Sequence, residues 1–282
     1  MRIGIESGAY LKKYGLKEGL ERMKRHGYDC LDYQFLADTE TELYRCGEPE
    51  FERRLNEIKE AAQQAGVEIV QTHGPWRWPP RDRTPEERAE RFEKMEKSIR
   101  ATRLLGVKYV IIHPIMPYGD GAQEDNAEFW AINFDFYGRL TKVAEREDVI
   151  ICLENMPMPE LPMARPAEIL DFVRKIDRPN LRVCLDTGHC AVCGVSPADA
   201  TRELGKEYLC TIHAHDNQGD RDYHLLPGEG IIDWPAFADA LREIGYEGAF
   251  CLETAVKGEM PAEECERRER ALADFVRQLV RG

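Results

Sequence analysis

Short apolar runs that predict β-strands alternate eight times along the chain with longer amphipathic runs that predict helices. Several helical runs are followed by glycine, as at Gly27, Gly66 and Gly106, where a left-handed residue can end a helix. This alternation predicts a parallel sheet, because each helix returns the chain to the edge where the next strand begins. The strands are expected at Arg2–Ser7, Tyr28–Phe35, Val67–His73, Val107–His113, Val149–Asn155, Leu181–Asp186, Tyr208–His215 and Ala249–Glu253.

Eight strand–helix units in 282 residues favour one α/β domain, spanning residues 1–282, of the (β/α)8 TIM-barrel class. The alternative is an open, doubly wound sheet, which would want a glycine-rich phosphate-binding turn after its first strand. Residues 7–10, Ser-Gly-Ala-Tyr, match such a turn only weakly. No linker or low-complexity segment divides the chain.

Charge and composition restrict the partners. Lysine and arginine number 39 against 52 aspartates and glutamates, a net charge of −13 that repels phosphate backbones and anionic membranes. No apolar run reaches membrane length, and the chain opens with a strand-like segment instead of a signal peptide. Nine cysteines, an odd number that falls mostly in apolar strands, indicate a reducing compartment. We therefore expect a cytoplasmic protein with no nucleic-acid or membrane partner.

Ionisable residues recur where the predicted strands end, which is the edge that carries the active site of such a barrel. Convergent carboxylates at one rim imply a cation among them, since burying unpaired charge is costly. A single histidine at a strand end would more often be structural, but packing does not explain a whole set. The set is Glu6, His73, His113, Glu154, Asp186, His213 and Glu253.

The most polar segment begins as the seventh strand and places His213, His215, Asp216, Asp222 and His224 within a dozen residues. Imidazoles beside carboxylates suit a divalent metal better than they suit a solvated loop.

Several cysteines fit a structural role. Cys152, Cys184 and Cys251 each precede a carboxylate by two residues and share its face, so we expect small core side chains there. Cys190 and Cys193 have C-x-x-C spacing, but no second cysteine pair supports a redox or zinc role.

Glu154 and Glu253 suggest a catalytic pair that moves protons on opposite faces of a substrate. Asp186 and His213 would complete a four-ligand site with them. Three carboxylates and one imidazole suit Mn²⁺, Co²⁺ or Mg²⁺ at least as well as Zn²⁺. Such an ion would polarise a carbonyl and stabilise an enediolate.

Six short motifs, in this order, resemble the xylose isomerase-like barrel superfamily, which contains sugar isomerases and epimerases as well as AP endonucleases of the endonuclease IV type. They span the third to the eighth strand. The motifs are Thr72-His-Gly, Ile112-His-Pro, Leu153-Glu-Asn, Leu185-Asp-Thr-Gly-His, the His213 segment with Pro227-Gly-Glu-Gly, and Leu252-Glu-Thr.

The resemblance to ketose 3-epimerases implies one divalent metal on Glu154, Asp186, His213 and Glu253, both glutamates as acid–base residues, and substrate contact by His189. The resemblance to endonuclease IV implies further Zn²⁺ ions. These would lie at His73 and His113, and at His189, Asp222 and His224.

We expect a metal-dependent isomerase or epimerase of a sugar or sugar phosphate, with a carbohydrate substrate and a homo-oligomeric state. Trp76 would stack on the sugar ring, although with Trp78 it could instead invade a DNA duplex. The alternatives are a zinc-dependent AP endonuclease, which the net charge opposes, a keto-inositol dehydratase and a non-catalytic binding barrel. Residues expected to bind substrate are His73, His113, His189, Asp222, His224, Trp76 and Arg221.

Overall fold

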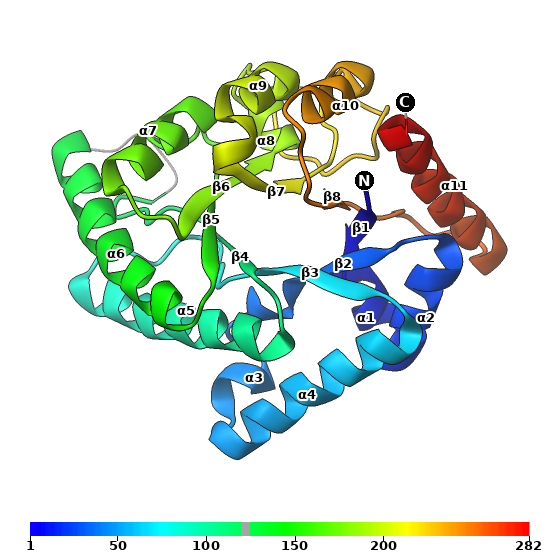
Figure 1. Cartoon of the computed structure of the whole chain (residues 1–282), viewed down its shortest axis with the longest axis horizontal. Helices are drawn as coiled ribbons and strands as arrows, with labels where there is room; N and C mark the ends of the chain where they lie inside the picture. Colours follow the sequence, from blue (N-terminus) through cyan, green and yellow to red (C-terminus); the bar gives the residue numbers. More distant parts are fainter. Residues whose placement is uncertain (120–124, 282) are drawn as a thin grey trace.

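The computed structural model describes residues 1–119 and 125–281, in which eight parallel strands form a nearly closed, single-domain barrel ringed by helices (Figure 1). The strands are hydrogen-bonded in the order β7-β6-β5-β4-β3-β2-β1-β8. A parallel bridge from Ala214 to Leu252 connects the end of β7 to β8. The TIM-barrel prediction is therefore confirmed. The strands are β1 Ile3–Glu6, β2 Cys30–Tyr33, β3 Glu68–His73, β4 Tyr109–Ile112, β5 Ile150–Glu154, β6 Leu181–Asp186, β7 Leu209–His213 and β8 Phe250–Leu252.

Helices cover the outside of the barrel (Figure 1). Gly27, Gly66 and Gly106 have positive φ and follow α2, α4 and α5, as the sequence predicts. Three short helices were not expected: α1, α3 and α8. The helices are α1 Gly8–Tyr14, α2 Leu16–His26, α3 Glu42–Arg45, α4 Glu48–Ala65, α5 Pro85–Leu105, α6 Asn126–Arg146, α7 Pro166–Ile176, α8 Thr187–Val192, α9 Pro197–Tyr208, α10 Trp234–Glu243 and α11 Ala262–Arg281, and a 3-10 turn spans Gln34–Leu36.

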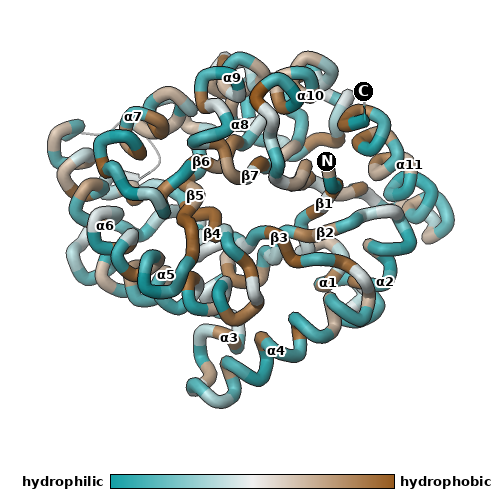
Figure 2. The backbone as a smooth tube through the Cα atoms, viewed as in Figure 1, coloured by the Kyte–Doolittle hydropathy of each residue, from teal (hydrophilic) through white to brown (hydrophobic). Residues whose placement is uncertain are grey.

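Apolar residues concentrate in the strands and on the inner faces of the helices (Figure 2). Cys152, Cys184 and Cys251 are completely buried beneath the carboxylate-bearing strand ends, as their spacing predicts. Gly4 of β1 lies between Cys30 and Cys251, where a Cβ atom would come within 2.9 and 2.8 Å of their sulfurs. Packing at this level of the barrel thus requires small side chains. Among the described helices, none is both long and apolar enough to cross a membrane.

Candidate active site

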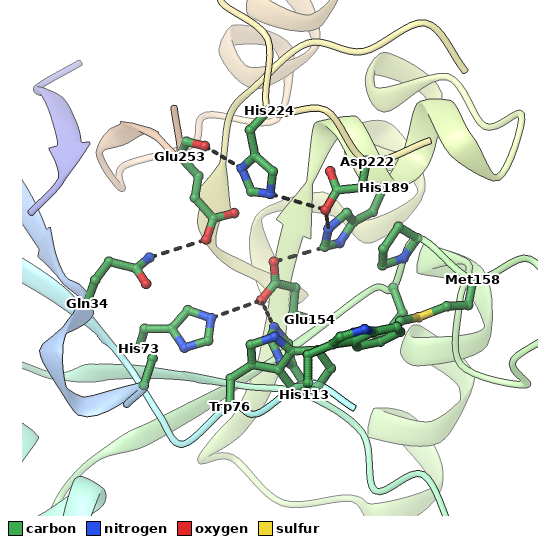
Figure 3. Close-up of a pocket in the computed structure, with 14 residues that line it drawn as sticks. Gln34, His73, Trp76, His113, Glu154, Met158, His189, Asp222, His224 and Glu253 are labelled. Carbon is green, nitrogen blue, oxygen red and sulfur yellow. Dashed lines mark hydrogen bonds and ion pairs between the residues drawn. The ribbon is translucent and has the colours of Figure 1, made fainter. Parts of the chain in front are cut away.

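A cavity of about 420 Å³ opens at the carboxyl ends of the strands (Figure 3). Titratable side chains occupy one side of it, and aromatic, proline and methionine side chains form the other. Its lining comprises Gln34, Ala37, His73, Trp76, Trp78, His113, Glu154, Met156, Pro157, Met158, His189, Asp222, His224 and Glu253.

Glu154, at the end of β5, is the centre of the polar side. Its Oε2 lies 2.8 Å from His113 Nε2 and 3.8 Å from His73 Nε2. Its Oε1 lies 2.9 Å from His213 Nδ1 and 3.9 Å from His189 Nδ1. Burial alone would raise the pKa of Glu154, but the imidazoles of His213 and His113 outweigh it and hold the pKa well below its usual value. This carboxylate is therefore ionised although it is buried.

His213, at the end of β7, links three carboxylates. Besides Glu154, its Nδ1 lies 3.3 Å from Glu253 Oε2, and its Nε2 lies 2.7 Å from Asp32 Oδ2. Burial lowers the pKa of His213, but Glu253 and Glu154 outweigh burial and raise the pKa well above its usual value. Burial raises the pKa of Glu253 to about 8. The two glutamates therefore share one imidazole nitrogen but have opposite protonation preferences.

Asp186 ends β6 and caps the short helix α8. Its Oδ1 accepts a 2.6 Å hydrogen bond from the backbone N–H of His189, and its Oδ2 lies 3.1 Å from His215 Nε2. Among the described residues, the imidazoles within 4 Å of this carboxylate are those of His189 and His215, not that of His213. A Cβ atom on Gly188 would come within 1.9 Å of the His215 ring, so the ring occupies space that only glycine leaves open.

The outer part of the polar side is built on Asp222. Its Oδ2 lies 3.1 Å from His224 Nε2 and 3.4 Å from His189 Nε2. Burial opposes the charged imidazolium of both residues. Asp222 nevertheless raises the pKa of His224 to about 9, and Asp186 and Asp222 raise the pKa of His189 to about 10. His224 also stacks on His215, with ring centroids 4.1 Å apart.

Asp216 fixes the loop that carries Asp222 and His224. Its buried carboxylate accepts hydrogen bonds from the backbone N–H groups of Gly228 and Ile232 and from the indole of Trp234. Trp234 is therefore an anchor for the loop that carries Asp222 and His224 over the cavity.

The apolar side of the cavity is aromatic. The Trp76 ring contacts the edge of His113 at 4.3 Å between centroids and lies 6.1 Å from Trp78. Trp78 is 57 % exposed, which is high for an indole and places it at the mouth of the cavity. An indole beside hydrogen-bonding groups suits a sugar, which has an apolar ring face and polar hydroxyls.

The structure places most of the predicted residues at this cavity. Asp186 and His213 lie beneath its surface, and Arg221 is exposed, with its guanidinium carbon 5.8 Å from the ring centre of Tyr223. Arg221 is absent from the lining, and a role in substrate binding stays a prediction. Sequence reasoning missed Asp32 and Gln34. It placed His215 in the polar segment without giving it a role, although His215 lies two residues beyond His213 on the same face.

The donor set fits a divalent cation. Groups of ligand atoms that lie within 4.8 Å of one another include His73 with His113 and Glu154, and His73 with His213 and Glu253. His73 Nδ1 donates to Gly74 O, so its Nε2 lone pair faces Glu154. Among the described residues, buried atoms without a hydrogen-bond partner include His113 Nδ1 and Asp222 Oδ1. Carboxylates and imidazoles that converge without a lysine or arginine in the described lining are typical of a metal centre.

Residues 20–279 match the family model described as xylose isomerase-like TIM barrel, and the chain belongs to this family. An uncharacterized protein of Methanocaldococcus jannaschii is 29 % identical over 262 residues, covering 90 % of this chain and 83 % of that protein. A D-psicose 3-epimerase of Ruminiclostridium cellulolyticum is 26 % identical, covering 84 % and 78 %. An inosose isomerase of Bacillus licheniformis is 24 % identical, covering 90 % and 88 %.

Solved structures show the same fold. A D-psicose 3-epimerase crystallised in the presence of D-fructose superposes with a TM-score of 0.78 at 20 % identity, and each chain is fully covered. The IolI protein with a bound zinc atom superposes with a TM-score of 0.77 at 22 % identity, covering 99 % of this chain and 98 % of that one.

Proposed function

We propose that the protein is a divalent-metal-dependent isomerase or epimerase that moves a proton at the carbon beside a sugar carbonyl. The observation that supports this most is the meeting of Glu154 and Glu253 at His213 Nδ1, at 2.9 and 3.3 Å, beside a cavity walled by Trp76. Two carboxyls of opposite protonation preference are what proton removal and return require. The epimerase and inosose isomerase relatives support the same reaction class.

Glu154, Asp186, His213 and Glu253 would hold the cation, which supplies positive charge for the carbonyl oxygen and a neighbouring hydroxyl of the substrate. One glutamate takes the proton from the carbon between these oxygens. In an epimerase the other glutamate returns a proton from the opposite face. His189 and His224 orient hydroxyl groups, and Trp76 packs against the ring.

The cavity favours an uncharged substrate. The described lining contains no lysine or arginine, and residues 120–124 contain neither residue in the sequence. Arg77 is engaged by Glu90 and by the carbonyl of Arg81. The imidazoles of His189 and His224 already pair with Asp222, and a phosphate dianion would be repelled by Glu154 and Asp222. We therefore expect kcat/KM for D-fructose to exceed that for its 6-phosphate at least about tenfold, a difference of about 1.4 kcal/mol. A preference for the phosphate would contradict this assignment.

The proposal is tested by metal analysis of the purified protein and by turnover of a panel of ketoses and inososes in D₂O. We expect a bound divalent metal, for which Mn²⁺, Co²⁺, Mg²⁺ and Zn²⁺ are the candidates, and deuterium at the reacting carbon of the product. Loss of activity on chelation, with recovery on adding back one ion, identifies the metal. A fully metallated protein that turns over no member of the panel would overturn the proposal.

One observation favours a second candidate, an AP endonuclease with three zinc ions. His73 and His113 gather on Glu154, while His189 and His224 gather on Asp222, as additional Zn²⁺ sites would require. Metal stoichiometry separates the candidates, since the isomerase needs one ion per chain and this nuclease would need three. The net charge of −13 supports the isomerase.

A further inference from the structure

Asp32, on β2, is a buried carboxylate that neither the acid–base pair nor the four-ligand site uses. It is fully inaccessible to solvent, and its partners are His213 Nε2 at 2.7 Å, Gln71 Nε2 at 3.1 Å and Gln34 Nε2 at 3.3 Å. All three contacts fall on Oδ2, and its Oδ1 is buried without a partner. Burying a carboxylate costs free energy unless hydrogen bonds and a paired charge offset it. None of its described hydrogen-bond partners is a lysine or arginine, so His213 is the one that can carry compensating charge.

We infer that Asp32 is a positioning residue that fixes the orientation and tautomer of His213 for metal binding. Because the Asp32 carboxylate can only accept a hydrogen bond, the Nε2 atom of His213 that contacts it carries a proton. Once a cation displaces the second proton of the imidazolium, the lone pair on Nδ1 is directed toward Glu154 and Glu253. Carboxylates that hold a metal-binding imidazole through its second nitrogen also raise its basicity as a ligand.

Gln34 extends this arrangement to a second ligand. Its amide nitrogen has two hydrogens, and it lies 3.3 Å both from Asp32 Oδ2 and from Glu253 Oε1. Figure 3 shows the contact between Gln34 and Glu253. The backbone around it is held by Ser7, whose hydroxyl accepts from Gln34 N and whose N–H donates to Asp32 O. Asp32 therefore orients His213 directly and Glu253 through Gln34. One buried carboxylate thus orients two of the four proposed metal ligands.

The inference rests on the proposed metal site, and Zn²⁺ titration of the metal-free protein against a chromophoric chelator tests it. Asp32→Ala should weaken Zn²⁺ binding about 10- to 100-fold, as loss of an outer-shell partner does. Asp32→Asn keeps one acceptor but not the charge, so its loss should be smaller. Asp29→Asn is the matched control, because Asp29 lies at the other end of β2 and bonds Ile3 N and Arg277. We expect wild-type affinity for the control.

Two results would overturn the role of Asp32. One is Zn²⁺ binding by both folded Asp32 variants within about twofold of wild type, well short of an outer-shell effect. The other comes from ¹⁵N-histidine NMR of Zn²⁺-loaded wild type, with His213 assigned by its loss in His213→Gln. The expected state has the metal on Nδ1 and the proton on Nε2. The reverse state refutes the inference even if neither Asp32 variant folds. A wild-type protein that binds no Zn²⁺ would instead refute the proposed metal centre.

Discussion

Replacing Glu253 with glutamine should separate proton transfer from folding. The pKa of Glu253 is about 8, so at pH 7 the metal-free protein holds it mostly as the neutral acid. Glutamine has nearly the same shape and no charge, and it can still accept from Gln34. We therefore expect metal-free Glu253→Gln to be at least as stable as wild type at pH 7, and up to about 3 kcal/mol more stable, because wild type must protonate this buried carboxyl on folding. The lost function is the proton, and general acid–base catalysis is typically worth about 10²- to 10⁴-fold in rate.

Glu154→Gln is the contrasting variant. Glu154 is ionised and lies within 4 Å of four imidazoles, so removing its charge leaves His113 without its carboxylate and takes from His213 one of its three. Loss of one member of a buried charged pair costs about 3–5 kcal/mol. This variant should therefore lose stability and metal affinity as well as turnover. Glu247→Gln, which removes an exposed carboxylate paired with Lys206, should leave all three unchanged.

The assay measures kcat at saturating metal for the ketose that wild type turns over best, with deuterium incorporation from D₂O. Both glutamine variants are scored only after metal analysis shows full occupancy, so that lost turnover reports the chemical step. A fully metallated Glu154→Gln or Glu253→Gln protein with near wild-type turnover would refute the two-glutamate mechanism.

Three further predictions concern the same site. Metal binding should release protons at pH 7, because Glu253 and His213 are protonated in the metal-free protein, and metal affinity should therefore rise between pH 6 and 8. Calorimetry in buffers of different ionisation enthalpy measures the proton release, and a metal affinity that does not depend on pH would contradict the prediction. Duplex DNA with an abasic site should bind weakly and with strong salt dependence, and efficient incision at physiological salt would make the nuclease the better assignment. Replacing both Cys190 and Cys193 by serine should leave metal content and activity unchanged, because burial raises the pKa of both thiols. Loss of a stoichiometric metal ion from the double variant would contradict this prediction.

The barrel could be predicted from the sequence because its signals are local. Left-handed glycines follow α2, α4 and α5, and each strand is a compact apolar run. The short helix α1 escaped prediction because the side chain of a strand residue begins it: the Glu6 carboxylate accepts hydrogen bonds from the N–H groups of Gly8 and Ala9. Helix α8 escaped for a similar reason, since Asp186 caps it while also belonging to the site. Six or seven residues are too few for helical periodicity to show.

The candidate site was only partly predictable, because strand alternation identifies a face and not the partners that meet across the barrel. His213 and His215 share a face of the strand, yet their imidazoles contact different carboxylates. His213 points toward the barrel axis and contacts Glu154, Glu253 and Asp32, which is 181 residues away in the chain, whereas His215 contacts Asp186. Nothing in the local sequence singles out Asp32, since it is the third residue of the four-residue strand β2 and belongs to no motif. The division follows from depth: His213 is still within β7, while His215 lies beyond its end, above Gly188. A cation bound through His213 Nδ1 would therefore draw Asp186 away from His215, and their 3.1 Å contact is the one that metal binding should change most.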